Sequence, residues 1–157
     1  MSRVQLALRV ADLEASIKFY ESLFGVEPAK RRPGYANFAV VEPPLKLVLI
    51  EGEPDQPTVM DHLGVEVETT DEVDDATSRL SELGLFTAVE NDTTCCYAVQ
   101  DKVWVHGPGA EPWEVYTVKA DAPDATSIRP EGQADTSGCE CGTPVSTSGV
   151  PLTSSCC

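Results

Sequence analysis

The chain has 157 residues, of which 41% are hydrophobic, and this is enough for the core of one domain or of two small modules that share a core. Its 26 acidic and 11 basic residues give a net charge of -15, which repels phosphate backbones and anionic lipids and argues against nucleic-acid and membrane partners. The N-terminus lacks an apolar run with a cleavage site, and no stretch approaches the ~18 apolar residues of a membrane span, so we expect a cytoplasmic protein.

The first half begins with a predicted strand at Val4–Val10, in which apolar residues alternate with more polar ones such as Gln5. A helix is expected next, because Asp12 can cap it, apolar residues follow at helical spacing, and Gly25 can end it. Two later strands are predicted at Tyr35–Val41 and Leu45–Glu51. We interpret this half as a βαβββ module.

The second half repeats this order after a proline-containing linker at Gly52–Val59. Its first strand, Met60–Glu68, alternates in the same way, and His62 takes the place that Gln5 has in the first strand. A helix is predicted at Asp71–Leu83, where a glycine follows. Short strands are then predicted at Phe86–Glu90, Lys102–His106 and Trp113–Val118.

The repeated order of elements predicts the fold class. We expect an α+β fold in which two βαβββ modules, residues 3–52 and 60–118, form a curled mixed sheet around a cavity within a domain of residues 1–118. Residues 119–157 contain no aromatic residue and are rich in Gly, Pro, Ser and Thr, too little apolar surface to offset chain entropy. We therefore expect a disordered, cysteine-rich tail there.

The six cysteines occur as close pairs: Cys95 and Cys96, Cys139 and Cys141, and Cys156 and Cys157. Disulfides between such neighbours are strained and close no long loop, so the pattern favours paired thiols in a reducing compartment. Two thiolates a few ångströms apart can chelate one soft ion. The tail pairs could capture or relay such an ion, or could be exposed thiols without a role.

The first candidate site consists of Gln5, His62 and Glu114, each on the polar face of a predicted strand. One imidazole, one amide oxygen and one carboxylate on one side of an ion leave positions for water, oxygen or substrate, close to the facial triad of non-haem iron enzymes. Gln5 is a weaker ligand than the second histidine usual in such triads, so iron would bind less tightly. Alternatively, all three are ordinary polar strand residues.

The second candidate site is the polar segment at residues 91–97, NDTTCCY, which we predict to be a loop. Polar loops on a rigid sheet commonly carry ligand-binding groups, and Cys95 and Cys96 could bind a soft ligand there. The alternative is that one of these cysteines is simply a small buried residue.

Lys102, Trp104 and His106 share one face of a predicted strand. Lys102 could lower thiolate pKa values or steer an anion, and Trp104 could form an apolar wall of the cavity. They could equally be a solvated charge, core filler and a surface residue. His106 could replace Gln5 as a metal ligand, but its place beside a Gly-Pro-Gly turn favours Gln5.

With these elements and residues, the chain resembles the vicinal oxygen chelate superfamily, which includes glyoxalase I, extradiol dioxygenases and fosfomycin-resistance proteins. The resemblance covers residues 3–118. Within it, VADLEASIKFYESLFGVEP, MDHLGVEV and NDTTCCYA are similar to the organoarsenical carbon–arsenic lyases and to the related cadmium-induced proteins.

The resemblance implies an Fe(II)-dependent dioxygenase that removes the organic group from trivalent organoarsenicals, such as methylarsenite and reduced aromatic arsenicals, and releases arsenite. Dioxygen would be the co-substrate, and Ni, Co or Mn could occupy the site in a purified sample. The implied metal ligands are Gln5, His62 and Glu114. The implied arsenic ligands are Cys95 and Cys96, which would also be catalytic. We predict that Tyr97, Lys102 and Trp104 also contact the substrate. Many such lyases have histidine in place of Gln5, which leaves the metal's identity open.

Two other functions stay open. The protein could sequester cadmium or arsenite through its cysteine pairs without chemistry, or it could be a metalloenzyme like glyoxalase or the fosfomycin-resistance proteins. The small-molecule ligand could be handled by a monomer or a homodimer. In a homodimer, Gln5 could come from a different subunit than His62 and Glu114.

Overall fold

The computed structural model describes residues 2–123. The tail cysteines at positions 139, 141, 156 and 157 lie outside the described residues. Within the described range, the elements are β1 (Arg3–Val10), α1 (Leu13–Phe24), β2 (Lys30–Arg32), β3 (Tyr35–Val40), β4 (Leu45–Glu51), β5 (Val59–Glu66), α2 (Thr70–Glu82), β6 (Ala88–Cys95), β7 (Ala98–His106) and β8 (Pro112–Asp121). Neither of these helices is long and apolar enough to cross a membrane.

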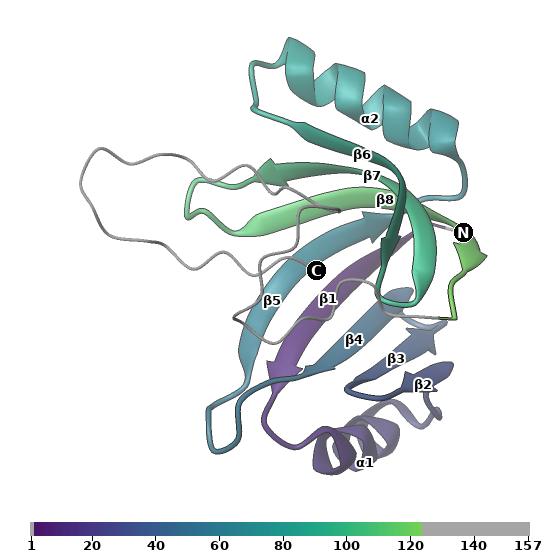
Figure 1. Ribbon diagram of the computed structural model, residues 1–157, viewed down its shortest axis with the longest axis vertical. Helices are drawn as coiled ribbons and strands as arrows, with labels where there is room; N and C mark the ends of the chain where they lie inside the picture. The colour runs from purple at the N-terminus through teal and green to yellow at the C-terminus, as the bar shows by residue number, and fades with distance from the viewer. Residues whose placement is uncertain (1, 124–157) are drawn as a thin grey trace.

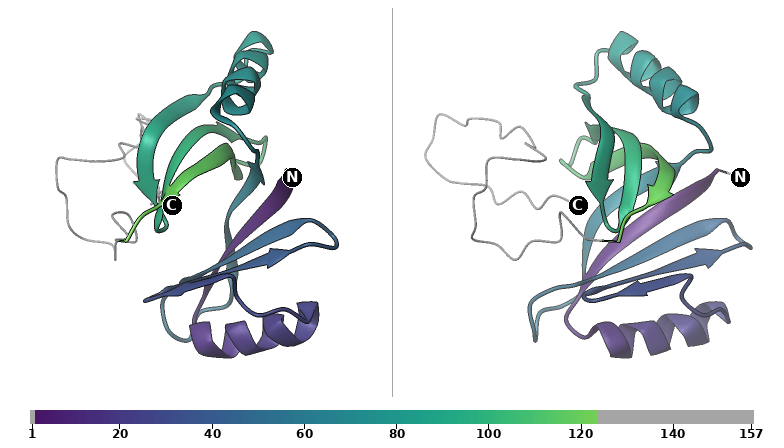
Figure 2. Two further views of the ribbon diagram at one scale, coloured as in Figure 1. Left: turned by 90° about the vertical axis from the view of Figure 1, so that its right-hand side faces the viewer. Right: turned by 45° about the vertical axis from the view of Figure 1, so that its right-hand side comes forward.

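The strands form one curled sheet in the order β2-β3-β4-β1-β5-β8-β7-β6 (Figure 1). At its centre β1 and β5 are antiparallel, and each is flanked by a parallel partner, β4 and β8 respectively. Helices α1 and α2 lie at opposite ends of the molecule, each outside the strands of its own module (Figure 2). The predicted α+β fold of two βαβββ modules around a curled sheet is confirmed.

The pairing of β1 with β5 relates the two modules by an approximate two-fold axis. Leu6 pairs with Leu63, and on either side Gln5 pairs with Gly64 and Ala7 pairs with His62. The axis therefore exchanges Gln5 with His62, as the matching strand phases predicted. Both side chains project from the centre of the sheet.

Helix α1 forms for the predicted reasons. The Asp12 carboxylate accepts a hydrogen bond from the Ala15 amide at 2.8 Å, and Gly25 ends the helix with φ 67. Leu13 and Ile17 are buried in a core with apolar residues of β1, β3 and β4. The apolar face of β1 is thus covered by α1, which leaves the face with Gln5 for the cavity.

Helix α2 begins with a capping box formed by Thr69 and Glu72, and it ends at Glu82, one residue before the predicted end. Val73 and Ala76 are its buried residues, and the helix packs against β7 and β8. The apolar contribution of this helix is small, so the second module has a thinner core than the first.

The predictions for β2, for β6 and for the loop after β6 differ from the structure. Strand β2 was not located, because its three residues are all cationic and it is an edge strand with no apolar alternation. Strand β6 begins at Ala88 and continues to Cys95, so the predicted strand at residues 86–90 ended too early and the predicted loop at 91–97 is largely wrong. Its polar residues fit a strand because β6 is the other, exposed edge.

Strands β7 and β8 are longer than predicted. Strand β7 starts at Ala98, four residues before the predicted Lys102, and β8 continues to Asp121, beyond the predicted end at Val118. The two strands pair along their whole length, from Ala98 with Asp121 to His106 with Pro112. This pairing brings the end of β8 beside the turn between β6 and β7.

Candidate metal and thiol site

Gln5, His62 and Glu114 converge on one point of the concave side of the sheet. Their exposed fractions are 3%, 4% and 2%. Gln5 Nε2 lies 3.0 Å from His62 Nε2 and 2.7 Å from Glu114 Oε1, and His62 Nε2 lies 3.4 Å from the same carboxylate oxygen. One chain supplies all three groups, from β1, β5 and β8.

The spacing of these three groups fits a divalent metal ion. Ligands about 2.1 Å from an ion and at right angles to one another are about 3.0 Å apart, and the three observed distances lie around this value. Among the described residues, no three His, Cys, Asp or Glu side chains form a metal site by themselves. The set depends on the amide of Gln5, whose oxygen would have to face the ion.

Hydrogen bonding around Tyr116 favours that orientation of Gln5. The Tyr116 hydroxyl lies 2.5 Å from Gln5 Oε1 and 2.7 Å from Glu66 Oε2, but it has one proton and can donate to only one of them. Although burial raises the pKa of Glu66, Lys46 and Tyr116 lower it more, so Glu66 is charged and is the stronger acceptor. Turning the amide lets Gln5 donate to Tyr116 and points its oxygen toward His62 and Glu114.

A β-bulge orients His62. The pairing of β1 with β5 shifts between Ala7 and Leu8, so Asp61 is an extra residue on β5. Its carboxylate therefore lies 2.7 Å from His62 Nδ1, although neighbours in a regular strand face opposite sides, and it also pairs with Arg9. This leaves Nε2 toward the metal position. Burial lowers the pKa of His62, but Asp61 and Glu114 outweigh it and raise the value to about 9.

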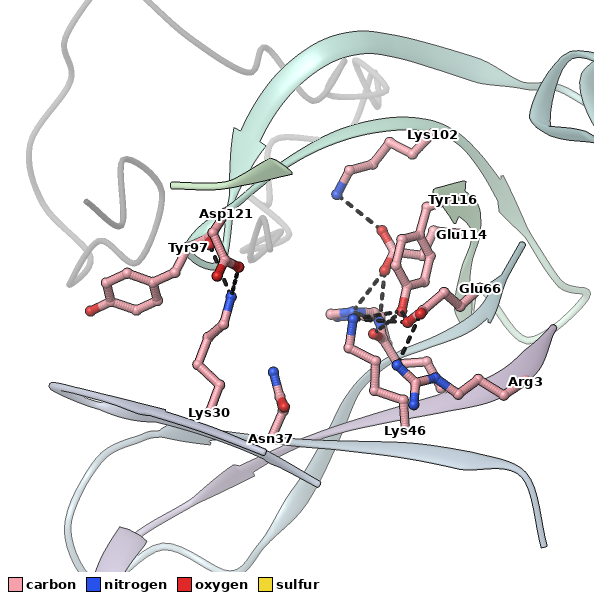
Figure 3. Close-up of polar contacts among 12 residues, drawn as sticks. Arg3, Lys30, Asn37, Lys46, Glu66, Tyr97, Lys102, Glu114, Tyr116 and Asp121 are labelled. Atoms are coloured by element: carbon pink, nitrogen blue, oxygen red, sulfur yellow. Dashed lines mark hydrogen bonds and ion pairs between the residues drawn. The ribbon is translucent and has the colours of Figure 1, made fainter. Parts of the chain in front are cut away.

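Lys102 orients the carboxylate of Glu114. Its Nζ lies 3.0 Å from Glu114 Oε2 (Figure 3). The other carboxylate oxygen, Oε1, lies 3.4 Å from His62 Nε2. Both side chains are buried, so the pair is shielded from water. Burial lowers the pKa of Lys102, but Glu114 and, after it, Cys95 raise the pKa by more than burial lowers it, so the amine is charged. The charged amine lies within the electrostatic reach of the thiols.

Cys95 and Cys96 lie at the tight turn between β6 and β7, with their sulfurs 3.2 Å apart, well beyond the ~2.05 Å of a disulfide bond. Cys95 pairs with Ala98, and the two residues between them, Cys96 and Tyr97, have φ of 52 and 63. Positive φ at both positions is typical of a type I′ turn, which favours Asn-Gly. Two larger residues in this conformation cost of order 1–2 kcal/mol each.

Tyr97 fixes this turn. Its hydroxyl donates to the Pro33 carbonyl at 3.0 Å, and its ring lies 5.6 Å from the ring of Tyr35. Its own carbonyl accepts from the Ala122 amide and from the Lys30 amine (Figure 3). These contacts of Tyr97 therefore fix the turn that carries the thiol pair.

The three candidate metal donors and the thiol pair line one cavity. Its lining residues are Gln5, Tyr35, Lys46, Val48, His62, Cys95, Cys96, Gln100, Lys102 and Glu114. Of the ten, six had been singled out from the sequence. Gln100 could have been predicted by extending the alternation of Lys102 and Trp104 back along β7. Lys46, Val48 and Tyr35 were not predicted to line a cavity, because the strands in which they lie are mainly apolar.

The other sequence candidates lie around this cavity rather than on its lining. Trp104 meets the His62 ring edge-on at 5.5 Å and lies 5.1 Å from Lys102 Nζ. Tyr97 supports the turn as described above. His106 is exposed at the end of β7, opposite Pro112, so the preference for Gln5 over His106 agrees with the geometry.

Comparisons with known proteins agree with this architecture. Residues 3–115 match the family model of the Glyoxalase/Bleomycin resistance protein/Dioxygenase superfamily. The chain is 72% identical over 122 residues to a trivalent organoarsenical cleaving enzyme of Thermomonospora curvata, covering 78% of this chain and 81% of that protein. It is 62% identical over 122 residues to the cadmium-induced protein CadI of Mycobacterium tuberculosis, covering 78% of this chain and 80% of that protein.

A solved structure shows the same fold. An extradiol ring-cleaving dioxygenase from B. fuscum superposes with a TM-score of 0.55 at 23% identity, over 76% of this chain and 33% of that one. The chain thus spans about a third of that dioxygenase.

Proposed function

The chain belongs to the Glyoxalase/Bleomycin resistance protein/Dioxygenase superfamily, and from this premise we propose that it is an Fe(II)-dependent dioxygenase that cleaves the carbon–arsenic bond of trivalent organoarsenicals and releases arsenite. The observation that carries the proposal is that a thiol pair and three convergent side chains able to bind a metal, Gln5, His62 and Glu114, line one cavity. The name of the relative from Thermomonospora curvata supports the substrate class.

The thiol pair has a spacing suited to trivalent arsenic. For sulfur bonds of about 2.3 Å, the distance of 3.2 Å between the sulfurs corresponds to an angle of about 90° at the bound atom. Trivalent arsenic, with three bonds and a lone pair, is pyramidal with angles near this value, whereas a tetrahedral ion would separate the sulfurs by about 3.8 Å. Cys95 and Cys96 would each replace one hydroxyl of the arsenical as water, which leaves the organic group as the third substituent.

Gln5, His62 and Glu114 would hold Fe(II), which would supply the activation of dioxygen. The protein's contribution is to fix both reactants. Asp61 sets the donor nitrogen of His62, and Lys102 sets the donor oxygen of Glu114. With its amide turned, Gln5 would donate to the Tyr116 hydroxyl and present its oxygen to the metal. Fixing the arsenical beside the metal replaces a bimolecular encounter by one geometry, which can contribute several kcal/mol.

Lys102 would serve both halves of the site. Its charge pairs with Glu114 and also faces the thiols of Cys95 and Cys96, so it compensates negative charge on the sulfurs before arsenic binds. Trp104 packs against His62 and Lys102 and excludes water from the rear of the site. This buried cation explains how acidic ligands and thiolates can share a small cavity.

Arsenic speciation after incubation of the Fe(II)-loaded protein with methylarsenite tests the proposal. We expect arsenite in air and none under nitrogen. Cys95→Ser and Cys96→Ser should each abolish turnover while Fe(II) binding is retained, and Ser22→Ala, on the outer side of α1, is the matched surface control. Equal arsenite release without oxygen would contradict the dioxygenase step. Normal turnover by either serine variant would contradict the role of the thiols in binding arsenic.

A second candidate function is sequestration of a soft ion without catalysis, because two sulfurs 3.2 Å apart could chelate one such ion. A relative from Mycobacterium tuberculosis is named a cadmium-induced protein. It predicts stoichiometric binding of cadmium or arsenite by the thiols and no conversion of methylarsenite. The speciation experiment separates the two functions, because only a lyase releases arsenite beyond one equivalent per protein.

A further inference from the structure

Gln100 is a buried polar residue that lines the cavity and has no role in the chemistry proposed above. It lies in β7, is 5% exposed and lines the cavity together with the thiols and the metal donors. Its Oε1 has no hydrogen-bond partner among the residues that the structure describes. A buried acceptor without a partner destabilises the fold, so such atoms usually meet a water or a ligand.

The position of Gln100 along β7 indicates which ligand group it meets. The thiol turn ends at Ala98, Gln100 follows two residues later, and Lys102, the partner of Glu114, follows after two more. Residues two apart face the same side of a strand about 7 Å from each other. Gln100 is thus placed between the thiols and the proposed metal donors, where a third substituent on thiol-bound arsenic would lie.

We propose that Gln100 accepts a hydrogen bond from an arsenic-bound hydroxyl, and that it thereby distinguishes arsenite from the organoarsenical. This inference rests on the proposed function, because it takes Cys95 and Cys96 to be the arsenic ligands. Gln100 would then bind the product, arsenite, and also a substrate that is attached through only one thiol and still carries a hydroxyl.

Ligand exchange at arsenic gives the discrimination. Methylarsenite has two hydroxyls, and each thiol that bonds to arsenic releases one of them as water, so methylarsenite bound by both thiols has no hydroxyl left. Arsenite has three hydroxyls and keeps one after the same two exchanges. The carbonyl of Gln100 can therefore accept a hydrogen bond from bound arsenite but not from fully bound methylarsenite.

The test compares the dissociation constants of arsenite and methylarsenite for the full-length, Fe(II)-loaded protein under nitrogen, where no turnover is expected. Gln100→Met keeps the length of the side chain and removes the acceptor, and Gln56→Met, in the exposed segment after β4, is the matched control. We expect Gln100→Met to weaken arsenite binding about five- to tenfold and to leave methylarsenite binding unchanged. Its melting temperature should equal or exceed that of the wild type, because a buried acceptor without a partner is removed.

Each other outcome contradicts the inference in its own way. If Gln100→Met binds both arsenicals as the wild type does, a water alone satisfies the carbonyl. If both bind more weakly by the same factor, Gln100 acts on the thiols and not on a hydroxyl. If the wild type binds neither arsenical and Cys95→Ser changes nothing, the proposed function fails together with this inference.

Discussion

The two modules share one fold, but the second carries nearly all of the chemistry. The axis between β1 and β5 exchanges Gln5 with His62 and Ala7 with Gly64. Because Glu114 pairs with Gly64 and Val48 pairs with Ala7, it also exchanges Glu114 with Val48. An apolar residue thus stands in the first module where the second has the carboxylate that we propose as a metal ligand.

The difference extends to the packing. The first module buries α1 against three strands in a continuous apolar core, whereas α2 buries only Val73 and Ala76 and the second module carries a buried network of charges. The bulge at Asp61 likewise has no counterpart in β1. Duplication therefore supplies a symmetric frame, and a few asymmetric substitutions in one half turn that frame into a site.

We expect the largest effect from replacing Glu114, which is anionic where the first module has Val48. Glu114→Gln should lower Fe(II) affinity by more than about 100-fold, since loss of a group that merely supports a ligand already costs about 10–100-fold. It should also destabilise the protein by about 3–5 kcal/mol, because Lys102 becomes a buried charge without its partner. Anaerobic Fe(II) titration and urea unfolding measure the two effects.

Two variants control this result. Val48→Ala, at the equivalent place in the first module, should change stability but not Fe(II) affinity. Adding Lys102→Met to Glu114→Gln should restore stability and leave Fe(II) affinity low. Fe(II) binding by Glu114→Gln at the wild-type affinity would show that the asymmetry at this position is unrelated to metal.

The next largest effect concerns Gly64, whose equivalent in the first module is Ala7. A Cβ at Gly64 would lie 3.2 Å from Gln5 Cβ and 3.2 Å from Glu114 Cγ, so a methyl there pushes two donors apart. We expect Gly64→Ala to lower Fe(II) affinity about tenfold and to cost about 1–3 kcal/mol of stability. Ala7→Gly should leave Fe(II) affinity unchanged; similar losses of affinity in both variants would contradict the distinction between the halves.

Tyr116→Phe tests the orientation of Gln5, the one ligand that the first module supplies. Without the hydroxyl, the amide loses the partner that turns its oxygen inward, and Fe(II) affinity should fall about tenfold. Tyr35→Phe removes a buried hydroxyl in the first module, which accepts from Asn37, and should affect stability only. An unchanged Fe(II) titration for Tyr116→Phe would refute the orienting role.

The smallest effect is the acid sensitivity of the second module. Burial raises the pKa of Asp101, but hydrogen bonds from Thr70, the Asp92 amide and Lys119 lower it more, so the folded value is below the unfolded one. Its contribution is therefore present above about pH 4 and is lost as the pH falls through the folded value. Asp101→Asn should lower the free energy of unfolding by about 1–2 kcal/mol at pH 7 and by less at pH 3.

Urea unfolding at the two pH values measures this dependence. Asp12→Asn, which keeps the cap of α1, should have little effect at either pH. An Asp101→Asn deficit that persists unchanged at pH 3 would show that the charge of Asp101 is not the cause.

The predictable part of the site is the part encoded in strand phase. Gln5, His62 and Glu114 follow from alternation in β1, β5 and β8, because one face of each strand must cover a core. Asp61 could not be assigned in this way, since its contact with His62 depends on a bulge that the sequence does not reveal. Gln100 was missed for a related reason: the polar edge strand β6 hid the true start of β7.

The turn at Cys96 and Tyr97 has a consequence for how this protein can be improved. Asn-Gly at these two positions would adopt the same backbone conformation at lower conformational cost. Selection for heat resistance alone would therefore favour replacing Cys96 and so removing its thiol. A thermostable descendant obtained in this way would keep the scaffold intact and lose the thiol pair that we propose binds the arsenical.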